Sequence, residues 1–273
     1  MKLADALEVV VRSDPGMVRP HNEDAVFADA ALGLAVLADG MGGYNAGEIA
    51  SGMATAVLAN SFGRFLPTWR PGAAGFADPD FARDYLMTEV GAANSAIYHA
   101  AQSQPQYAGM GTTLVLAWLY DNHLSVAHVG DSRLYRWRGS VLEQLTRDHS
   151  FLQEQIDSGL ISAEEARHSQ NKNLVTRALG VDPAVAVEVN DFAVHAGDIL
   201  LLCSDGLNDM VEDEEIALTL QALGSNLPLA AEQLIQMAND NGGRDNVSLI
   251  LVRVKGDFTV DRSWWQKLMG YFG

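Results

Sequence analysis

The chain has 273 residues, of which 48% are hydrophobic and 19% charged, a composition typical of a globular protein with a substantial core. The 35 acidic and 18 basic side chains give a formal net charge of −17. This charge excludes general binding to nucleic acids or anionic membranes, because both require a positive surface. Most of the excess serves solubility, and a part of it could surround cations.

The only cysteine, Cys203, excludes an intrachain disulfide and ends the apolar run ILLLC. Asp205 and Asp209 follow it where a thiol-dependent phosphatase needs an arginine, so Cys203 is not expected to be a nucleophile. The amino-terminal apolar stretch contains Asp5 and Glu8, which is unlike a signal peptide, and no run is long enough to span a bilayer. We therefore expect a cytoplasmic protein.

Helices and antiparallel hairpins are predicted along the chain. Helical spacing of apolar residues predicts helices over 46–58 and 85–97, separated by a long surface loop at Pro67–Asp80. Two hairpins follow, with strands at 112–120 and 124–129, joined by Asp121-Asn122, and at 133–137 and 141–145, joined by Arg138-Gly139. Further elements are a capping box at Ser162–Glu165, strands at 185–192, 199–203 and 247–254, and a helix at 228–239. Consecutive hairpins favour an α+β fold whose antiparallel sheets are covered by helices.

Acidic residues recur where apolar runs begin or end. The stretches VLADGMGG at Val36–Gly43 and ILLLCSDGLND at Ile199–Asp209 both pass from an apolar run to Asp-Gly. The residues in such positions are Glu23, Asp24, Asp39, Asp131, Asp205 and Asp245. They could belong to separate surface turns, but we expect them at one edge of the sheets, where repulsion between carboxylates calls for cations. An all-oxygen ligand set without His or Cys at metal spacing favours Mg²⁺ or Mn²⁺.

The same pattern suggests a reaction. A strand fixes Asp39, and Gly40 has no Cβ, so the Gly40 carbonyl could also reach a cation. Two cations that share a carboxylate can lower the pKa of a water from about 15.7 towards neutrality and make it a nucleophile for phosphorus. Arg19, just before Glu23, is the candidate that grips phosphate oxygens, with Arg12 as its competitor.

An ordered set of motifs extends this interpretation over almost the whole chain, from about Val9 to Val254. The motifs are RPHNEDA, DGMGGYNAGEIAS, MGTTLV, VGDSRLYRWRG, LTRDHS, NLVTRALG, LLLCSDGLND and GGRDNVSLILV. In this order they resemble the metal-dependent serine/threonine protein phosphatases of the PPM family (protein phosphatase type 2C), in the compact bacterial form. One motif alone would be weak, whereas the ordered set is specific.

The resemblance implies a β-sandwich of two antiparallel sheets flanked by pairs of helices. It implies a phosphatase domain at 1–257, with a flap at about 149–180 that contacts protein substrates, and hydrolysis of phosphoserine and phosphothreonine. By the same resemblance, Asp39 would bridge two cations, Asp205 and Asp245 would complete the first cation site, and Glu23 with the Gly40 carbonyl would complete the second. Asp24 would order bound water, and Asp131 would hold a third and weaker cation. Arg19 would bind the phosphate.

The chain departs from the family at two positions that bear on the leaving-group acid. Met41 stands where some members have a candidate general acid, and Tyr44 stands where bacterial relatives often have histidine. His21, Tyr44 or a metal-bound water could each donate the proton. The stretch Gly42–Glu48 imitates a phosphate loop, but Glu48 replaces the required lysine, which excludes nucleotide binding there.

We therefore expect a monomeric protein phosphatase that opposes a serine/threonine kinase. Two alternatives remain: an inactive phosphoprotein-binding module with this fold, and a hydrolase of small phosphoesters. The aromatic tail Phe258–Gly273 could dock on its own domain, contact a protein or lie on a membrane surface. A contact with a protein partner is the hypothesis for this tail.

Overall fold

The computed structural model describes residues 1–43, 46–66, 79–162, 165–166, 169 and 174–259. Within these residues the strands are β1 Leu7–Asp14, β2 Asp24–Asp29, β3 Leu34–Met41, β4 Gly111–Thr112, β5 Leu114–Tyr120, β6 His123–Val129, β7 Arg133–Arg138, β8 Val141–Gln144, β9 Glu188–Ala193, β10 Ile199–Cys203 and β11 Val247–Val254. The helices are α1 Leu3–Ala6, α2 Ala46–Phe65, α3 Pro79–Ser103, α4 Phe151–Asp157, α6 Asp205–Asn208, α7 Asp213–Leu223 and α8 Leu227–Asp240, with a 3₁₀ turn at Pro105–Tyr107.

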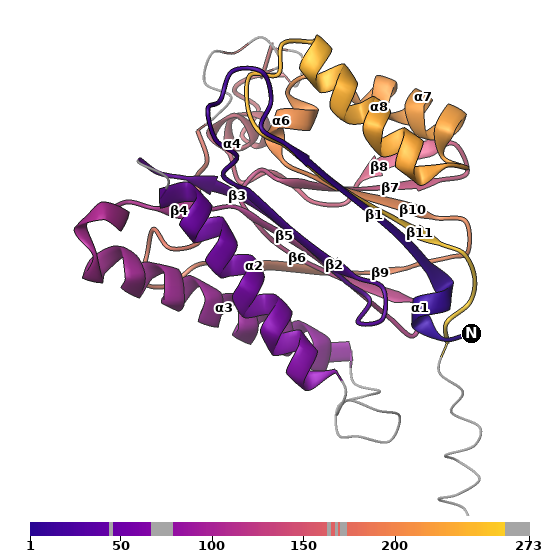
Figure 1. Cartoon of the computed structure of the whole chain (residues 1–273), viewed down its shortest axis with the longest axis horizontal. Coiled ribbons are helices and arrows are strands. Elements are labelled where there is room, and N and C mark those ends of the chain that lie inside the picture. Colours follow the sequence, from indigo (N-terminus) through magenta and orange to yellow (C-terminus); the bar gives the residue numbers. More distant parts are fainter. Residues whose placement is uncertain (44–45, 67–78, 163–164, 167–168, 170–173, 260–273) are drawn as a thin grey trace, which may run out of the picture.

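Two antiparallel sheets face each other and form a sandwich. One sheet has the strand order β1-β11-β10-β7-β8, and the other has the order β2-β3-β5-β6-β9, with β4 paired to β3. Figure 1 shows α2 and α3 along one outer side of the sandwich and α7 and α8 along the other. The predicted α+β sandwich flanked by pairs of helices is confirmed.

Three apolar layers hold these elements together, and they explain the unbroken apolar runs of the sequence. Leu200 and Leu202 of β10 pack between the two sheets, whereas Leu201 and Cys203 pack against α7 and α8. Both faces of the strand are therefore buried, so no polar alternation is needed. Burial raises the pKa of the Cys203 thiol to about 12, which keeps it protonated and supports its exclusion as a nucleophile.

The two predicted hairpins are confirmed. In the first, β5 and β6 are joined by Asp121 and Asn122, which have φ angles of 47° and 59°. In the second, β7 and β8 are joined by Gly139 and Ser140, with φ angles of 56° and 69°. Positive φ at both central residues is typical of the tight turns that match strand twist. The second turn lies one residue later than the predicted Arg138-Gly139.

Two strands differ from the predicted bounds. The strand expected at 112–120 is divided at Thr113, because its amide donates to the Asp39 carbonyl instead of continuing the ladder. The strand expected at 185–192 begins at Glu188, which pairs with His128 as the last residue pair of the β6–β9 ladder. Beyond that pair β6 ends at Val129, and Gly130 turns the chain away with a φ of 105°.

Several predicted segments lie partly outside the described residues. These are the loop 67–80, the flap 149–180 and the tail beyond Thr259. Ser162 and Glu165 do make the predicted capping contacts, and Phe258, the first residue of the predicted tail, is buried between the sheets at 4% exposure. Among the helices described, none combines the length and apolar character needed to cross a membrane.

Candidate metal centre

Asp24 and Asp39 are brought together by the register of two strands. β2 and β3 pair antiparallel and place Asp24 directly opposite Asp39. The Asp39 carbonyl accepts hydrogen bonds from the Thr112 hydroxyl at 2.7 Å and from the Thr113 amide at 2.9 Å, while the Asp39 amide donates to the Thr113 hydroxyl at 3.1 Å. These bonds fix the backbone of Asp39 at the point where β4 and β5 separate.

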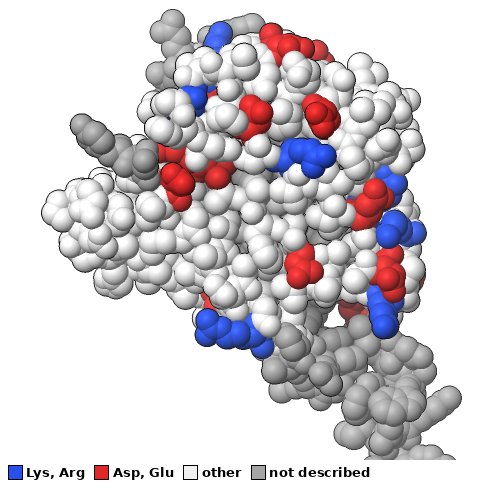
Figure 2. Space-filling view, in the orientation of Figure 1, with Lys and Arg blue, Asp and Glu red and all other residues white. Residues whose placement is uncertain are grey.

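The sheet that contains β10 and β11 supplies Asp205 and Asp245 to the same end of the sandwich. Asp205 begins α6 two residues after the end of β10, and Asp245 lies two residues before the start of β11. Between the sheets, the Ser204 hydroxyl donates to Asp24 Oδ2 at 2.9 Å, and the Ser248 amide donates to the Ser204 hydroxyl at 3.0 Å. Figure 2 shows acidic side chains gathered at the upper left of the molecule, the end at which α2 begins in Figure 1.

Desolvation and mutual repulsion act on these carboxylates. Desolvation is the largest cause, and neighbouring charges add to it, so the pKa values of Asp39 and Asp205 are raised well above the ordinary range. Desolvation likewise raises the pKa of Asp24 to about 6 and that of Asp131 to about 7. The charges that act on Asp39 come from Asp24, Asp205, Asp131 and Asp245, so the predicted aspartates lie close enough for their charges to act on Asp39.

The carboxylates also leave polar atoms without partners. Among the described residues, Oδ1 of Asp24 and Oδ1 of Asp205 are buried and accept no hydrogen bond. Burying such an oxygen unpaired is unfavourable, and a hard divalent cation would satisfy it. The donor set therefore fits Mg²⁺ or Mn²⁺.

Gly40 is required by close packing. A Cβ at Gly40 would lie 2.2 Å from the Gly47 carbonyl oxygen and 2.5 Å from the Glu23 carbonyl oxygen. The first turn of α2 thus packs directly on the backbone that follows Asp39. The expected contact between the Gly40 carbonyl and a cation stays a prediction.

A buried asparagine holds the loop that carries Arg19 and Glu23. Asn246, which is 5% exposed, accepts from the Glu23 amide at 2.8 Å and donates to the carbonyls of Pro15 and His21 at 3.0 and 2.9 Å. Sequence reasoning missed this residue, although its place next to Asp245 in GGRDNVSLI was a usable signal. His21 thus contributes its backbone here, and Tyr44, the other protein candidate for the leaving-group acid, lies outside the described residues.

Arg19 lies at the cluster and Arg12 does not. Arg19 Nη2 is 2.6 Å from Asp245 Oδ2, and this hydrogen bond is the main cause that raises the pKa of Arg19. The Arg19 side chain is 50% exposed, so its guanidinium is accessible from solvent. Arg12 lies in β1 and reaches Glu232 of α8 at 4.0 Å, on the outer side of the sandwich.

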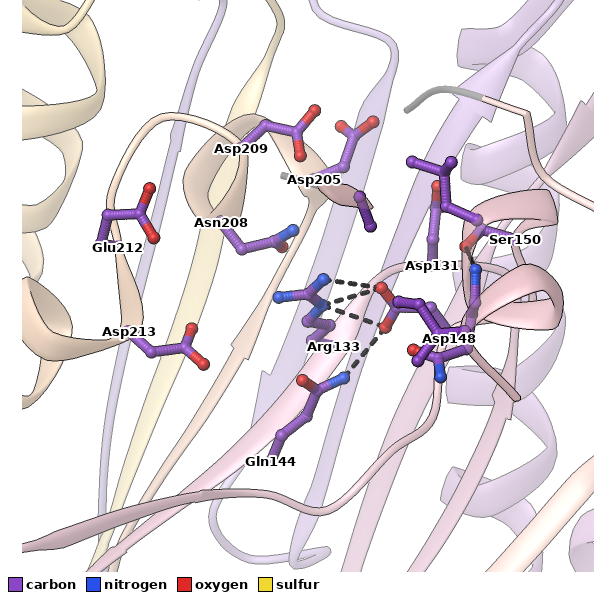
Figure 3. A pocket seen from close by; sticks show the side chains of 14 residues that line it. Asp131, Arg133, Gln144, Asp148, Ser150, Asp205, Asn208, Asp209, Glu212 and Asp213 are labelled. Atoms are coloured by element: carbon purple, nitrogen blue, oxygen red, sulfur yellow. Dashed lines mark hydrogen bonds and ion pairs between the residues drawn. The ribbon is translucent and has the colours of Figure 1, made fainter. Parts of the chain in front are cut away.

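Asp131 opens onto a cavity beside the cluster. It lies between β6 and β7, is 7% exposed, and lines a cavity of about 250 Å³ together with Asp205. Figure 3 shows Asp148 and Ser150 on the same side of this cavity as Asp131, and Glu212 and Asp213 on the other side. Asp209 lines the same cavity and also raises the pKa of Asp131 and Asp205, a contribution that sequence reasoning missed.

A second cluster with potential ligands lies at His128, His149 and Glu188, whose ligand atoms are within 4.8 Å of one another. Two features oppose a metal there. The imidazole rings stack with centroids 4.4 Å apart and planes 16° apart, so their lone pairs lie in parallel planes and cannot converge. The Gly130 amide donates to His149 Nδ1 at 3.1 Å, which leaves the proton of the neutral ring on Nε2, facing Glu188. We interpret this cluster as a hydrogen-bonded stack.

Comparisons with known proteins agree with this fold. A family model described as Protein phosphatase 2C matches residues 19–247. The chain is 41% identical over 251 residues to the serine/threonine protein phosphatase PstP of Mycobacterium tuberculosis, which covers 91% of this chain and 45% of that protein. It is 38% identical over 244 residues to the serine/threonine phosphatase stp of Listeria welshimeri, which covers 88% of this chain and 93% of that protein.

Solved structures give the same result. The catalytic domain of PstP in complex with 2 manganese ions is similar with a TM-score of 0.77 and 40% identity, over 90% of this chain and 97% of that one. The chain belongs to the protein phosphatase 2C family, which confirms the resemblance inferred from the ordered motifs. It spans about half the length of its PstP relative, 45%.

Proposed function

We propose that this protein removes phosphate from phosphoserine and phosphothreonine in proteins in a reaction that depends on Mn²⁺ or Mg²⁺. The observation that carries this proposal is the convergence of aspartates from both sheets with buried, unpartnered oxygens, in a chain whose similar relatives are named serine/threonine phosphatases. An opposing kinase would supply the phosphorylated substrates, and we expect the protein to act as a monomer.

The proposed ligands follow from the positions described above. Asp39 would hold both cations, Asp205 and Asp245 the first, and Glu23 with the Gly40 carbonyl the second. When bound, the two cations would supply an acidified water nucleophile and neutralise charge on the phosphoryl group. A third and weaker cation would bind at Asp131, on the cavity side.

The protein's own groups would orient the substrate. Arg19 would hold phosphate oxygens from the solvent side, since its half-exposed guanidinium lies beside Asp245. Asp24 would accept a hydrogen bond from the attacking water, held in place by the Ser204 hydroxyl on its other oxygen. The completeness of this set supports an enzyme over an inactive phosphoprotein-binding module.

The test is hydrolysis of a phosphothreonine peptide, measured as released phosphate in Mn²⁺ with and without excess EDTA. We expect turnover with Mn²⁺, loss with EDTA and recovery when Mn²⁺ is restored. A folded protein that binds Mn²⁺ and the peptide without releasing phosphate would instead support the binding module. Turnover of aryl phosphates alone would support a hydrolase of small phosphoesters.

A further inference from the structure

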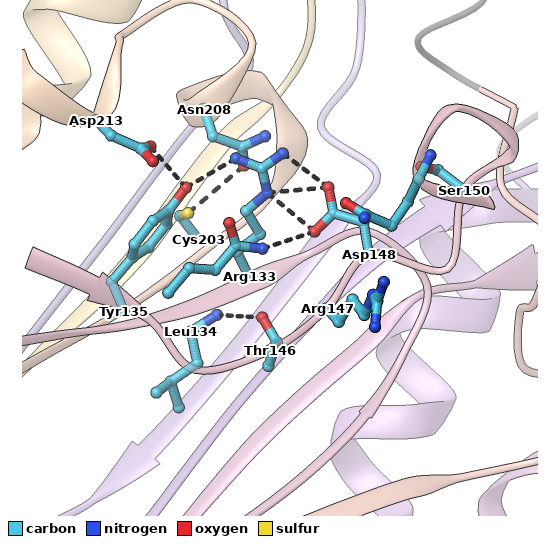
Figure 4. A network of polar contacts seen from close by, with 12 residues as sticks. Arg133, Leu134, Tyr135, Thr146, Arg147, Asp148, Ser150, Cys203, Asn208 and Asp213 are labelled. Atoms are coloured by element: carbon cyan, nitrogen blue, oxygen red, sulfur yellow. Dashed lines mark hydrogen bonds and ion pairs between the residues drawn. The ribbon is translucent and has the colours of Figure 1, made fainter. Parts of the chain in front are cut away.

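One buried guanidinium joins several elements next to the cavity. Arg133 Nε donates to both oxygens of Asp148 at 3.0 Å, and Nη2 donates to Asp148 Oδ2 at 2.7 Å (Figure 4). Its remaining nitrogen, Nη1, donates to the Tyr135 hydroxyl at 2.8 Å. The two charged side chains are 23% and 10% exposed, so water screens the pair little.

The network extends beyond this pair. The Tyr135 hydroxyl donates to Asp213 Oδ1 at 3.0 Å, at the start of α7, and the Gln144 amide donates to Asp148 Oδ1 at 2.9 Å from β8. Each of the three guanidinium nitrogens of Arg133 thus donates a hydrogen bond to a neighbouring side chain (Figure 4). A lysine in its place could not make the same set of directed bonds.

The pair links the backbone of Asp131 to the beginning of α4. Arg133 follows Asp131 by two residues, and Asp148 precedes Ser150 by two residues. Ser150 caps α4, because its hydroxyl accepts from the Gln153 amide at 3.2 Å. The His149 amide donates to the Gly130 carbonyl at 2.9 Å and reinforces the same junction.

The helix positioned in this way is a wall of the cavity. Leu152, Gln153 and Ile156 of α4 line the same cavity as Asp131 and Asp205. Because α4 is a helix of 7 residues, it has little stability of its own, and its place depends on the residues at its cap. The Arg133–Asp148 pair is the buried charged contact at that cap.

We propose that Arg133 is a positioning residue for extended substrates: through Asp148 it holds the α4 wall of the cavity at a fixed distance from the carboxylate cluster. This proposal rests on the proposed phosphoprotein activity. A small phosphoester needs only the cluster, whereas residues beside the phosphothreonine of a peptide reach the cavity and its α4 wall. Loosening this wall should weaken peptide binding more than small-ester binding.

The chain contains a matched control on the same strand. Arg138, at the other end of β7, donates to Asp198 through Nε at 2.7 Å and through Nη2 at 2.6 Å. These two bonds make the pair bidentate, like Arg133–Asp148. The Asp198 side chain is 1% exposed, so the pair is also partly buried. It joins β7 to the segment before β10 and has no part in the cavity wall.

The first experiment compares R133K and D148N with R138K and D198N in the Mn²⁺-loaded protein. KM and kcat are measured for a phosphothreonine peptide of about ten residues and for para-nitrophenyl phosphate. We expect R133K and D148N to raise the peptide KM at least fivefold more than the aryl phosphate KM, and the control variants to change both equally. An equal change for both substrates in R133K and D148N would overturn the proposal.

The second experiment does not depend on activity. Amide hydrogen exchange is measured for Glu154–Asp157 of α4 in the same four variants. We expect exchange at least tenfold faster in R133K and D148N and unchanged in the controls, and unchanged exchange in all four would overturn the proposal. If the wild-type protein fails to hydrolyse the peptide but the exchange result holds, the positioning role stands and the proposed function fails. Should R133K not fold, D148N, which keeps the shape of the side chain, carries both tests.

Discussion

The aspartates of the cluster differ in how far the surrounding protein satisfies their charge. Asp24 receives hydrogen bonds from Ser204 and Ser248, which lower its pKa and offset part of the desolvation. Asp39 faces four other carboxylates, whose repulsion adds to desolvation. The residue proposed to contact both cations is therefore among those whose negative charge is least compensated in the protein alone.

Removing the charge of Asp39 should have opposite effects on metal binding and on the metal-free fold. D39N should lower Mn²⁺ affinity by more than about tenfold in isothermal titration, because a charged ligand becomes neutral. The same variant should raise the Tm in EDTA, because repulsion within the cluster is relieved. Wild-type Mn²⁺ affinity in D39N would remove Asp39 from the proposed centre.

Gly40 in β3 and Gly52 in α2 should respond in opposite directions to replacement by alanine. G40A should lower stability by about 1–3 kcal/mol, because its Cβ would lie 2.2 Å from the Gly47 carbonyl oxygen. G52A in α2 is the control: its Cβ meets nothing within 4 Å, and alanine there should stabilise the helix by about 0.5–1 kcal/mol. Urea unfolding measures both, and equal effects would contradict the packing argument.

At the scale of elements, the tight turn between β7 and β8 is strained at one position. Ser140 has a φ of 69°, which costs a residue with a Cβ roughly 1 kcal/mol, and the turn type favours glycine there. S140G should therefore raise stability by about 0.5–1 kcal/mol in urea unfolding. S140V should lower it, because a β-branched side chain tolerates this conformation least. A destabilised S140G would contradict the assigned turn.

Patterns within one segment predicted most elements and the grouping of the aspartates. β10 and β11 have the predicted bounds, because runs buried on both faces stand out from their flanks. Asp39 and Asp205 were expected together because each ends such a run. Asn246 and Ser204 were not identified, because their importance comes from contacts with residues at 15–24, which are 180 or more positions away.

Contacts between segments also determine where the two strands with wrongly predicted bounds begin or break. The interruption at Thr113 follows from its bond to Asp39, and the late start of β9 follows from the end of its partner β6. Neither partner is visible from local periodicity. The Arg133–Asp148 pair was missed for the same reason, since pairing depends on the hairpin that lies between the two residues.

For the molecule as a whole, the raised pKa values give a definite pH dependence. Burial raises the pKa of Asp24 to about 6 and that of Asp131 to about 7, against about 3.9 for an aspartate exposed to water. A carboxyl whose folded pKa is raised contributes stability that is complete below its unfolded pKa and lost as pH rises through the folded pKa. Metal-free protein should therefore lose stability between about pH 4 and pH 7.

This dependence is measured as Tm in EDTA from pH 5 to pH 8, with D131N as the control whose slope should be smaller. Saturating Mn²⁺ should reverse the trend, because the ligands must lose their protons to bind the ion. At 100 times its dissociation constant, Mn²⁺ should add about 2.7 kcal/mol of stability. A Tm in EDTA that rises steadily from pH 5 to pH 8 would contradict the assigned shifts.

The place of β11 has a consequence for synthesis on the ribosome. β11 is the last described strand along the chain, but in its sheet it lies between β1, near the start of the chain, and β10. A nascent polypeptide that lacks residues 247–254 therefore has two unpaired strand edges and cannot bring Asp24 and Asp205 to their final places. Such edges invite pairing with other chains. The domain therefore cannot complete its fold, or gain protection from proteases, until the last described strand has emerged from the ribosome.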